Sequence, residues 1–298
     1  MQNILSGRAP RRFATLFALL CLSAISCLPA AAQADHDHPA AAKPGAEKND
    51  KSQEKVPDKD KLPPLPPDAH TQQSITVDGK KLTYTVTVGT LIARDADGKP
   101  AGDVVYTAYT VDQPNRPVTF AFNGGPGASS VFLNFGAIGP KHLDNVGNEG
   151  ASASDPPTLT DNQGTWLDFS DLVFIDPIGT GFSHAIGSGK PEDFYGVDED
   201  ANSVAQFIEL WLSKYGRWNS PKILMGESYG SERAAILPRA LMGGPTYLGM
   251  MRGITVNGIV LLGTALGTHP DTPPNADEIL ADQALALPGF AAAAWYHN

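Results

Sequence analysis

The chain has 298 residues, of which 42% are hydrophobic and 18% charged, with a formal net charge of -10. This size and composition suffice for one large buried core, so a second folded domain is not required. An acidic chain repels phosphate backbones, which argues against nucleic acid as a partner.

The N-terminus has the pattern of a secretory signal peptide. Three arginines precede an apolar run over 13–28, and the small residues that follow end in the A-x-A site Ala32-Gln33-Ala34. We therefore predict cleavage before Asp35, a secreted or periplasmic location and no membrane span, since the run is short for one. Arg11-Arg12 would also suit the twin-arginine route, although the residues after it fit loosely. Lipid attachment at Cys27 is poorly supported by the residues before it.

Both cysteines of the chain, Cys21 and Cys27, lie inside this leader segment 1–34. The mature chain would therefore have neither a thiol nor a disulfide, which excludes a cysteine nucleophile and a thiolate metal site. The leader also holds three arginines and no acid, so its removal changes the net charge from -10 to -13.

Residues 35–71 are rich in proline, lysine and acids and contain no aromatic residue. Such a segment buries too little apolar surface to offset its ordering entropy, and we predict a disordered linker. His36 and His38 would bind a metal ion only weakly, and a solvated tail is the simpler interpretation. The predicted organisation is a signal peptide over 1–34, a linker over 35–71 and one folded domain over 72–298.

The folded part begins with a pattern typical of an antiparallel hairpin. Over 81–88 apolar residues alternate with threonines, which predicts a half-buried strand. A turn at Asp97-Gly98 then leads to a return strand over 104–111.

From residue 117 onward the pattern changes to continuous apolar strands separated by amphipathic helices. The predicted strands are 117–122, 171–175, 222–225 and 258–262, with helices from about Asp198 and over 231–242. This alternation predicts an α/β fold with a mostly parallel sheet covered on both faces. Ligands of such sheets bind at the carboxyl ends of the strands.

Two glycine-rich loops leave predicted strands at that end. Residues 226–230 read GESYG and fit G-x-S-x-G, which exposes a nucleophilic serine, here Ser228, on a sharp strand-to-helix turn. Residues 123–130 read NGGPGASS, whose adjacent glycines would let backbone N–H groups point at a developing oxyanion. Taken singly, the first pattern can arise by chance and the second can be a tight turn without a ligand.

Together, NGGPGASS, DPIGTGFS over 176–183 and GESYGS over 226–231 resemble the serine carboxypeptidase family, whose fold is the α/β-hydrolase fold. The ending over 287–297 resembles the entry to the cap insertion of bacterial members. The resemblance implies a peptide or another acyl group as the substrate, and no metal or other cofactor.

The resemblance also implies roles for single residues. Ser228 would be the catalytic nucleophile, and the N–H groups of Gly125 and Tyr229 would form the oxyanion hole. Asn123 and Glu227 would bind the C-terminal carboxylate of a peptide, with Glu227 protonated so that it can donate a hydrogen bond. A buried acid that ties two loops together is the structural alternative for Glu227.

The sequence departs from the family pattern in three respects. Ala137 stands where many members have a second acid, and Ala128 replaces a usual cysteine. After the strand over 258–262 we find no residue matching the family's triad aspartate or histidine; only His269 and His297 lie downstream, and His184 is interpreted as a pocket wall. We therefore expect that the C-terminal strands are missing and that these 298 residues alone are essentially inactive, because a serine needs an adjacent base.

Three functional interpretations follow. The first is a serine-type carboxypeptidase-like hydrolase acting through an acyl-enzyme on Ser228. The second is an esterase or acyltransferase of the same fold, which Ala137 mildly favours. The third is a catalytically inactive protein that keeps the pocket and binds without turnover.

Overall fold

The computed structural model describes residues 64–144, 156–243, 251–264 and 275–297. The expected signal peptide and most of the expected linker lie outside these residues. The chain divides into two compact units, one over 57–268 and one formed by 1–56 with 269–298. In the described residues the second unit consists of one helix, α5 (Ala276–His297).

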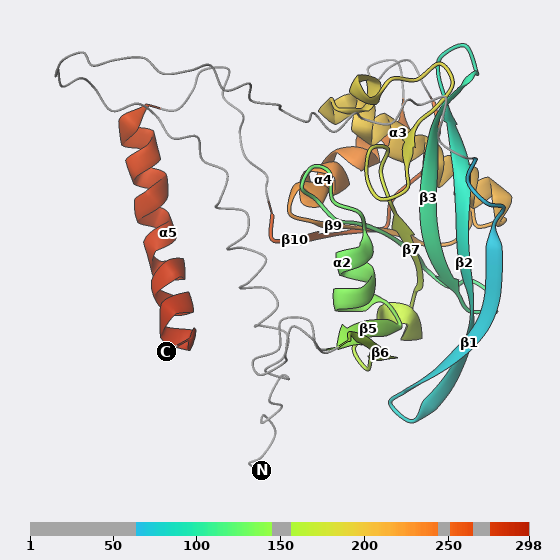
Figure 1. Cartoon of the computed structure of the whole chain (residues 1–298), viewed down its shortest axis with the longest axis horizontal. Coiled ribbons are helices and arrows are strands. Elements are labelled where there is room, and N and C mark those ends of the chain that lie inside the picture. The colour runs from blue at the N-terminus through green and yellow to red at the C-terminus, as the bar shows by residue number, and fades with distance from the viewer. Residues whose placement is uncertain (1–63, 145–155, 244–250, 265–274, 298) are drawn as a thin grey trace, which may run out of the picture. The chain divides into compact units, whose positions relative to one another are not determined.

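The described part of the unit over 57–268 is built on one eight-stranded sheet (Figure 1). Its main path runs β1-β2-β3-β7-β4-β9-β10, and the short β8 pairs with β3. The strands are β1 (Ala69–Val77), β2 (Lys80–Arg94), β3 (Pro100–Thr110), β4 (Val118–Phe122), β7 (Asp171–Ile175), β8 (His184–Ala185), β9 (Lys222–Glu227) and β10 (Gly258–Leu262). A separate hairpin is formed by β5 (Lys141–Asp144) and β6 (Thr158–Asp161).

The sheet has an antiparallel and a parallel half. The first three strands and β7 pair antiparallel, whereas β7, β4, β9 and β10 are parallel. The parallel strands are the four apolar runs of the sequence, and β4 and β7 are buried at every residue. This arrangement confirms the predicted α/β-hydrolase fold, in which antiparallel N-terminal strands (the lead-in) precede a mostly parallel sheet.

The lead-in is longer than the sequence pattern indicates. The hairpin strands extend over Lys80–Arg94 and Pro100–Thr110, and β1 adds a third strand that begins at Ala69, three residues before the expected start of the domain. β1 was not predicted because seven of its nine side chains are exposed. Its order comes from pairing with β2 along its whole length, which no periodicity within the segment reveals.

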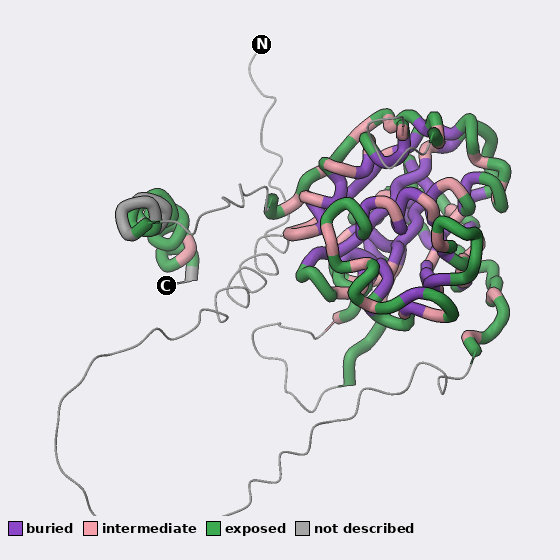
Figure 2. The backbone as a smooth tube through the Cα atoms, turned by 90° about the horizontal axis from the view of Figure 1, so that it is seen from above, coloured by how far each residue is buried: buried purple, intermediate pink, exposed green. Residues whose placement is uncertain are grey.

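Helices and short helical turns cover both faces of the parallel half. On one face, α3 (Val197–Lys214) and α4 (Tyr229–Met242) pack on Val118, Phe120 and Phe122 of β4 and share one hydrophobic core. The other face carries α2 (Val131–Leu133), the π-helical turn η3 (Asn134–Ile138) and the 3-10 turn η4 (Trp166–Asp168). A further 3-10 turn, η5 (Pro191–Phe194), precedes α3. Figure 2 shows the buried backbone concentrated inside this unit.

Alternate residues of each central strand serve the two faces. In β4, Phe120 and Phe122 enter the core with α3 and α4, while Ala121 belongs to the core on the opposite face. Trp211 of α3 lies edge-on to Phe120, with ring centroids 5.4 Å apart. This double burial explains why the strands read as unbroken apolar runs.

Within the described residues, no helix is long and apolar enough to cross a membrane.

Candidate active site

Ser228 lies between the end of β9 at Glu227 and the start of α4 at Tyr229. Its backbone has φ 56° and ψ −125°, a conformation that costs a non-glycine residue about 1–3 kcal/mol. Two contacts hold the turn in place: the Ser228 N–H donates to the Leu262 carbonyl at 2.8 Å, and Ser231 Oγ donates to the Ser228 carbonyl at 2.6 Å. The strained serine is therefore fixed from both β10 and α4.

Glycines at 226 and 230 allow this turn to be so tight. A Cβ at Gly226 would lie 1.8 Å from the Gly230 carbonyl oxygen, and a Cβ at Gly230 would lie 2.6 Å from the Phe122 oxygen. Any side chain at either position would separate strand and helix. The spacing in G-x-S-x-G thus has a steric origin here.

The NGGPG loop packs directly against the Ser228 turn. Its strand β4 is the parallel neighbour of β9, with Phe122 opposite Gly226, so both loops leave the same edge of the sheet. A Cβ at Gly124 would lie 2.5 Å from the Tyr229 nitrogen and 2.9 Å from Ser228 Cβ. The next residue, Gly125, has φ 108° in a tight bend against Gly127. The backbone that carries the expected donors is thus in contact with the serine turn.

Asn123 and Glu227, the two residues expected to bind a carboxylate, contact each other. Asn123 Nδ2 donates to Glu227 Oε2 at 3.0 Å, and Asn123 Oδ1 accepts the Leu133 N–H at 2.9 Å. Asn123 is buried, and its amide is oriented by both bonds. Asn123 directly follows β4, and Glu227 ends the neighbouring strand β9 and precedes Ser228 in the chain.

Asp176, which was not identified from the sequence as a site residue, joins the two loops that follow β4 and β7. Its Oδ1 accepts the Ser130 N–H at 2.8 Å, and its carbonyl accepts Ser183 Oγ at 2.7 Å. Burial raises the pKa of the Asp176 carboxyl, while the Ser130 N–H acts in the opposite direction. An aspartate placed directly after an apolar parallel strand was the available signal.

Arg233 of α4 was also missed, because arginine on an amphipathic helix normally faces solvent. Here it is buried and donates from Nε to Asp200 Oδ2 of α3 at 2.7 Å. Its Nη1 donates to the Asn123 carbonyl at 3.1 Å. Burial raises the pKa of Asp200, and the charge of Arg233 partly opposes this shift.

The remaining residues singled out in the sequence lie as follows. Ala137 is in the π-helical turn, where its carbonyl accepts Asn162 Nδ2 at 2.7 Å. His184 lies on β8, with Nδ1 3.0 Å from the Phe182 carbonyl oxygen and Nε2 3.9 Å from Asp103 Oδ2. His269 and the His297 side chain lie outside the described residues. The described residues contain no cluster of three or more metal-ligating side chains.

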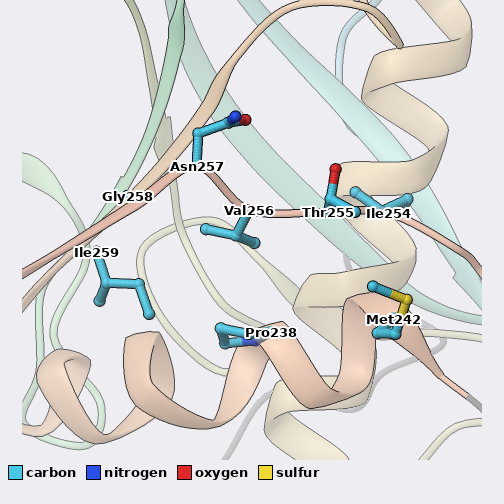
Figure 3. Close-up of a pocket in the computed structure, with 8 residues that line it drawn as sticks. All are labelled: Pro238, Met242, Ile254, Thr255, Val256, Asn257, Gly258 and Ile259. Atoms are coloured by element: carbon cyan, nitrogen blue, oxygen red, sulfur yellow. The ribbon is translucent and has the colours of Figure 1, made fainter.

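An apolar groove lies elsewhere, along the C-terminal half of α4 (Figure 3). Pro238 and Met242 form one wall, and the segment 254–259 forms the other. Pro238 is ten residues along the helix from Ser228, which corresponds to about 15 Å of helix axis. The groove lining has no charged side chain, and Thr255 is its only hydroxyl group, with no acid or histidine in the lining to activate it, so the groove is not a second candidate for the chemistry.

Comparisons with known proteins agree with this geometry. The serine carboxypeptidase family model matches residues 105–246. The pheromone-processing carboxypeptidase kex1 of Penicillium rubens is 30% identical over 176 residues, which cover 56% of this chain and 26% of that protein. The pheromone-processing carboxypeptidase kex1 of Talaromyces marneffei is 32% identical over 131 residues, which cover 43% of this chain and 19% of that protein.

Among solved structures, Kex1(delta)p, a prohormone-processing carboxypeptidase from Saccharomyces cerevisiae, is 22% identical with a TM-score of 0.44, covering 60% of this chain and 38% of that one. The matched curated relatives are fungal, so they do not support the bacterial subtype expected from the sequence. The chain spans about a quarter or less of the length of those relatives. Over residues 105–246 the chain is thus similar to the serine carboxypeptidase family.

Proposed function

We propose that this protein is a serine-type carboxypeptidase-like hydrolase that removes C-terminal residues from peptides. The observation that carries the proposal is the contact between the Gly124 backbone and the turn at Ser228 and Tyr229. It brings a strained serine and a glycine loop together at the carboxyl ends of two parallel strands, where ligands of α/β sheets bind. The names of the curated relatives, which are carboxypeptidases, point the same way.

In this proposal the Ser228 hydroxyl attacks the carbonyl carbon of the last peptide bond. The tetrahedral intermediate places a negative charge on the former carbonyl oxygen, and the N–H groups of Gly125 and Tyr229 donate to it. One such donor typically contributes about 3 kcal/mol to the stability of the transition state. The C–N bond then breaks, the proton lost by the Ser228 hydroxyl is transferred to the departing nitrogen, and the C-terminal residue leaves as an amine. Water attacks the acyl-enzyme next, the Ser228 ester bond breaks, and one proton of the water returns to the serine oxygen.

Asn123 and Glu227 select for a free C-terminus in this scheme. Their side chains already share a hydrogen bond of 3.0 Å, so a neutral Glu227 carboxyl and the Asn123 amide group can donate to one carboxylate together.

Covalent labelling tests the nucleophile. The protein expressed from its complete coding sequence should react with a fluorophosphonate probe at Ser228, and Ser228→Ala should abolish the label. Ser213→Ala on α3 is a matched control that should label normally. If the probe labels nothing, a non-catalytic binding protein is favoured. If it labels Ser228→Ala equally, Ser228 is not the nucleophile and the proposed mechanism is wrong.

A pair of peptides then separates the carboxypeptidase from the second candidate, an esterase or acyltransferase. That candidate is favoured by Ala137, which stands where a second acid would support carboxylate binding. We expect a peptide with a free C-terminus to be cleaved faster than its C-terminal amide. Equal cleavage of the two peptides would contradict the proposed binding of the C-terminal carboxylate by Asn123 and Glu227, and would favour the esterase.

We further infer that the protein is exported, with residues 1–34 removed as a signal peptide and 35–71 acting as a linker. N-terminal sequencing of the mature protein from its own host should begin at Asp35. A mature chain that begins at an acylated Cys27 would contradict this inference and indicate a lipoprotein.

A further inference from the structure

Arg233 contacts both segments that flank the proposed oxyanion hole. Its guanidinium carbon lies 5.3 Å from the ring centroid of Phe122, the last residue of β4, and 5.4 Å from that of Tyr229, the residue after the nucleophile. Its Nη1 also donates to the Asn123 carbonyl at 3.1 Å, at the start of the glycine loop. One planar cation thus touches the strand end, the loop and the serine turn.

Arg233 is itself held rigidly. Its side chain is only 3% exposed, and its Nε pairs with Asp200 on α3 at 2.7 Å. The planar guanidinium can donate in fixed directions while stacking on aromatic faces, which a lysine ammonium cannot do. Movement of the Asn123 carbonyl relative to Tyr229 would break either the hydrogen bond or the ring contacts.

We propose that Arg233 is a positioning residue that fixes the NGGPG loop against the Ser228 turn, with Asp200 as its anchor. This inference rests on the proposed function, because it assigns Arg233 to alignment of the Gly125 and Tyr229 N–H groups on the oxyanion. Such alignment matters in the transition state more than in substrate binding, since charge develops on the oxygen only there. Loss of the contact to Asn123 therefore lowers kcat and leaves KM for a small ester nearly unchanged.

A single substitution at Arg233 would change both the position of the loop and the stability of the protein, because Arg233→Met leaves the buried Asp200 carboxyl without its cation. The double variant Arg233→Met/Asp200→Asn removes both charges and should recover much of the lost melting temperature. A purely structural arginine would then regain kcat as well. A positioning arginine would not, since the double variant still lacks the donor to the Asn123 carbonyl.

The experiment measures kcat, KM and melting temperature for a small ester substrate with the protein expressed from its complete coding sequence. We expect kcat to fall about 10- to 100-fold in the double variant, with Arg233→Lys intermediate. Saturating fluorophosphonate should show the same loss in the rate of Ser228 labelling. The probe has no carboxylate, so this rate is independent of the Asn123 and Glu227 pair.

Arg116→Met/Asp171→Asn provides a control at a second buried ion pair, in which Asp171 also contacts Arg217 at 2.6 Å and a larger loss of stability is expected. Arg116 is also buried and its Nε pairs with Asp171 at 2.9 Å, but the pair lies at the start of β7, at the opposite end of the sheet. This control should lose stability and keep kcat at temperatures well below its melting point.

Two results would overturn the inference. If the wild type hydrolyses the ester and the Arg233→Met/Asp200→Asn variant keeps the wild-type kcat, Arg233 is structural and the proposed function still stands. If the wild type neither hydrolyses the ester nor is labelled at Ser228, both the proposed function and the positioning role of Arg233 are wrong.

Discussion

At the scale of single residues, the contact of Gly124 with the serine turn depends on the absence of one methyl group. A Cβ at this residue would meet backbone atoms first: the Tyr229 nitrogen at 2.5 Å and the Glu227 carbonyl oxygen at 2.6 Å. Backbone atoms at the end of a strand and the start of a helix cannot rotate away as a flexible side chain can. A side chain at Gly124 must therefore push the two loops apart.

Gly124→Ala should consequently impair both folding and chemistry. We expect a loss of about 1–3 kcal/mol in the free energy of unfolding from overpacking, and a fall of about 100-fold in the rate of Ser228 labelling. Urea denaturation and fluorophosphonate kinetics measure the two effects. Gly258→Ala is the control, because its nearest neighbour atom, Ile223 Cγ1, would lie at an ordinary 3.8 Å. Equal labelling rates for the two variants would contradict the expectation.

The residues that sequence reasoning found and missed differ in a physical way. The serine turn and the glycine loop could be predicted because a local spacing fixes their backbone geometry. Arg233 and Asp176 were missed because their importance comes from partners 33 and 46 residues away, Asp200 and Ser130. A single sequence carries little information on such pairs.

At the scale of elements, the loops after β4 and β7 are joined through the Asp176 carboxyl. Burial raises the pKa of this carboxyl above its ordinary value of 3.8. The folded state therefore binds a proton more tightly than the unfolded state. This contribution to stability is fully present below the ordinary pKa and is lost as the pH rises through the higher pKa of the folded protein.

Asp176→Asn removes this titration while keeping an oxygen that can accept the Ser130 N–H. We expect the stability of the wild type relative to Asp176→Asn to decrease as the pH is raised from about 4 through the folded pKa, and then to level off. Urea unfolding of both proteins across that pH range measures the difference, in which the shared titratable groups cancel. Parallel pH profiles would show that the Asp176 pKa is the same in both states.

Whether a strand could be predicted from the sequence depended on whether it contains an apolar run. The strands β4, β7 and β9 were found because burial leaves apolar runs in the sequence. The run of β10 is equally apolar, although none of its five residues is buried. β1 has no such run, and its order depends on its partner β2. The short α2 and the π-helical turn after it are likewise set by tertiary contacts, including the bond from the Leu133 N–H to Asn123.

At the scale of the whole molecule, residues 35–298 would have to hold their core together without a disulfide, because they contain no cysteine. Cys21 and Cys27 are the only cysteines of the sequence and both precede the predicted cleavage site. In the described residues the unit over 57–268 has two hydrophobic clusters, one on each face of the sheet. Burial of apolar surface is thus the main stabilising term available to it.

A reducing agent should therefore leave the melting temperature unchanged in a protein that is expressed as residues 1–298 and cleaved to residues 35–298. Thermal unfolding with and without dithiothreitol, followed by circular dichroism, measures this directly. A shift caused by the reductant would mean that the leader cysteines are retained and form a disulfide, which would also contradict cleavage before Asp35.

The close packing of Gly226 against Gly230 limits which residues can occupy these two positions during evolution. Because a methyl group at either position would collide with backbone, selection for folding alone is enough to keep both glycines. A descendant of this protein that had lost catalysis would still display the glycine pair around position 228. The glycine pair therefore reports the geometry of the turn, and catalysis has to be judged from the reactivity of Ser228 itself.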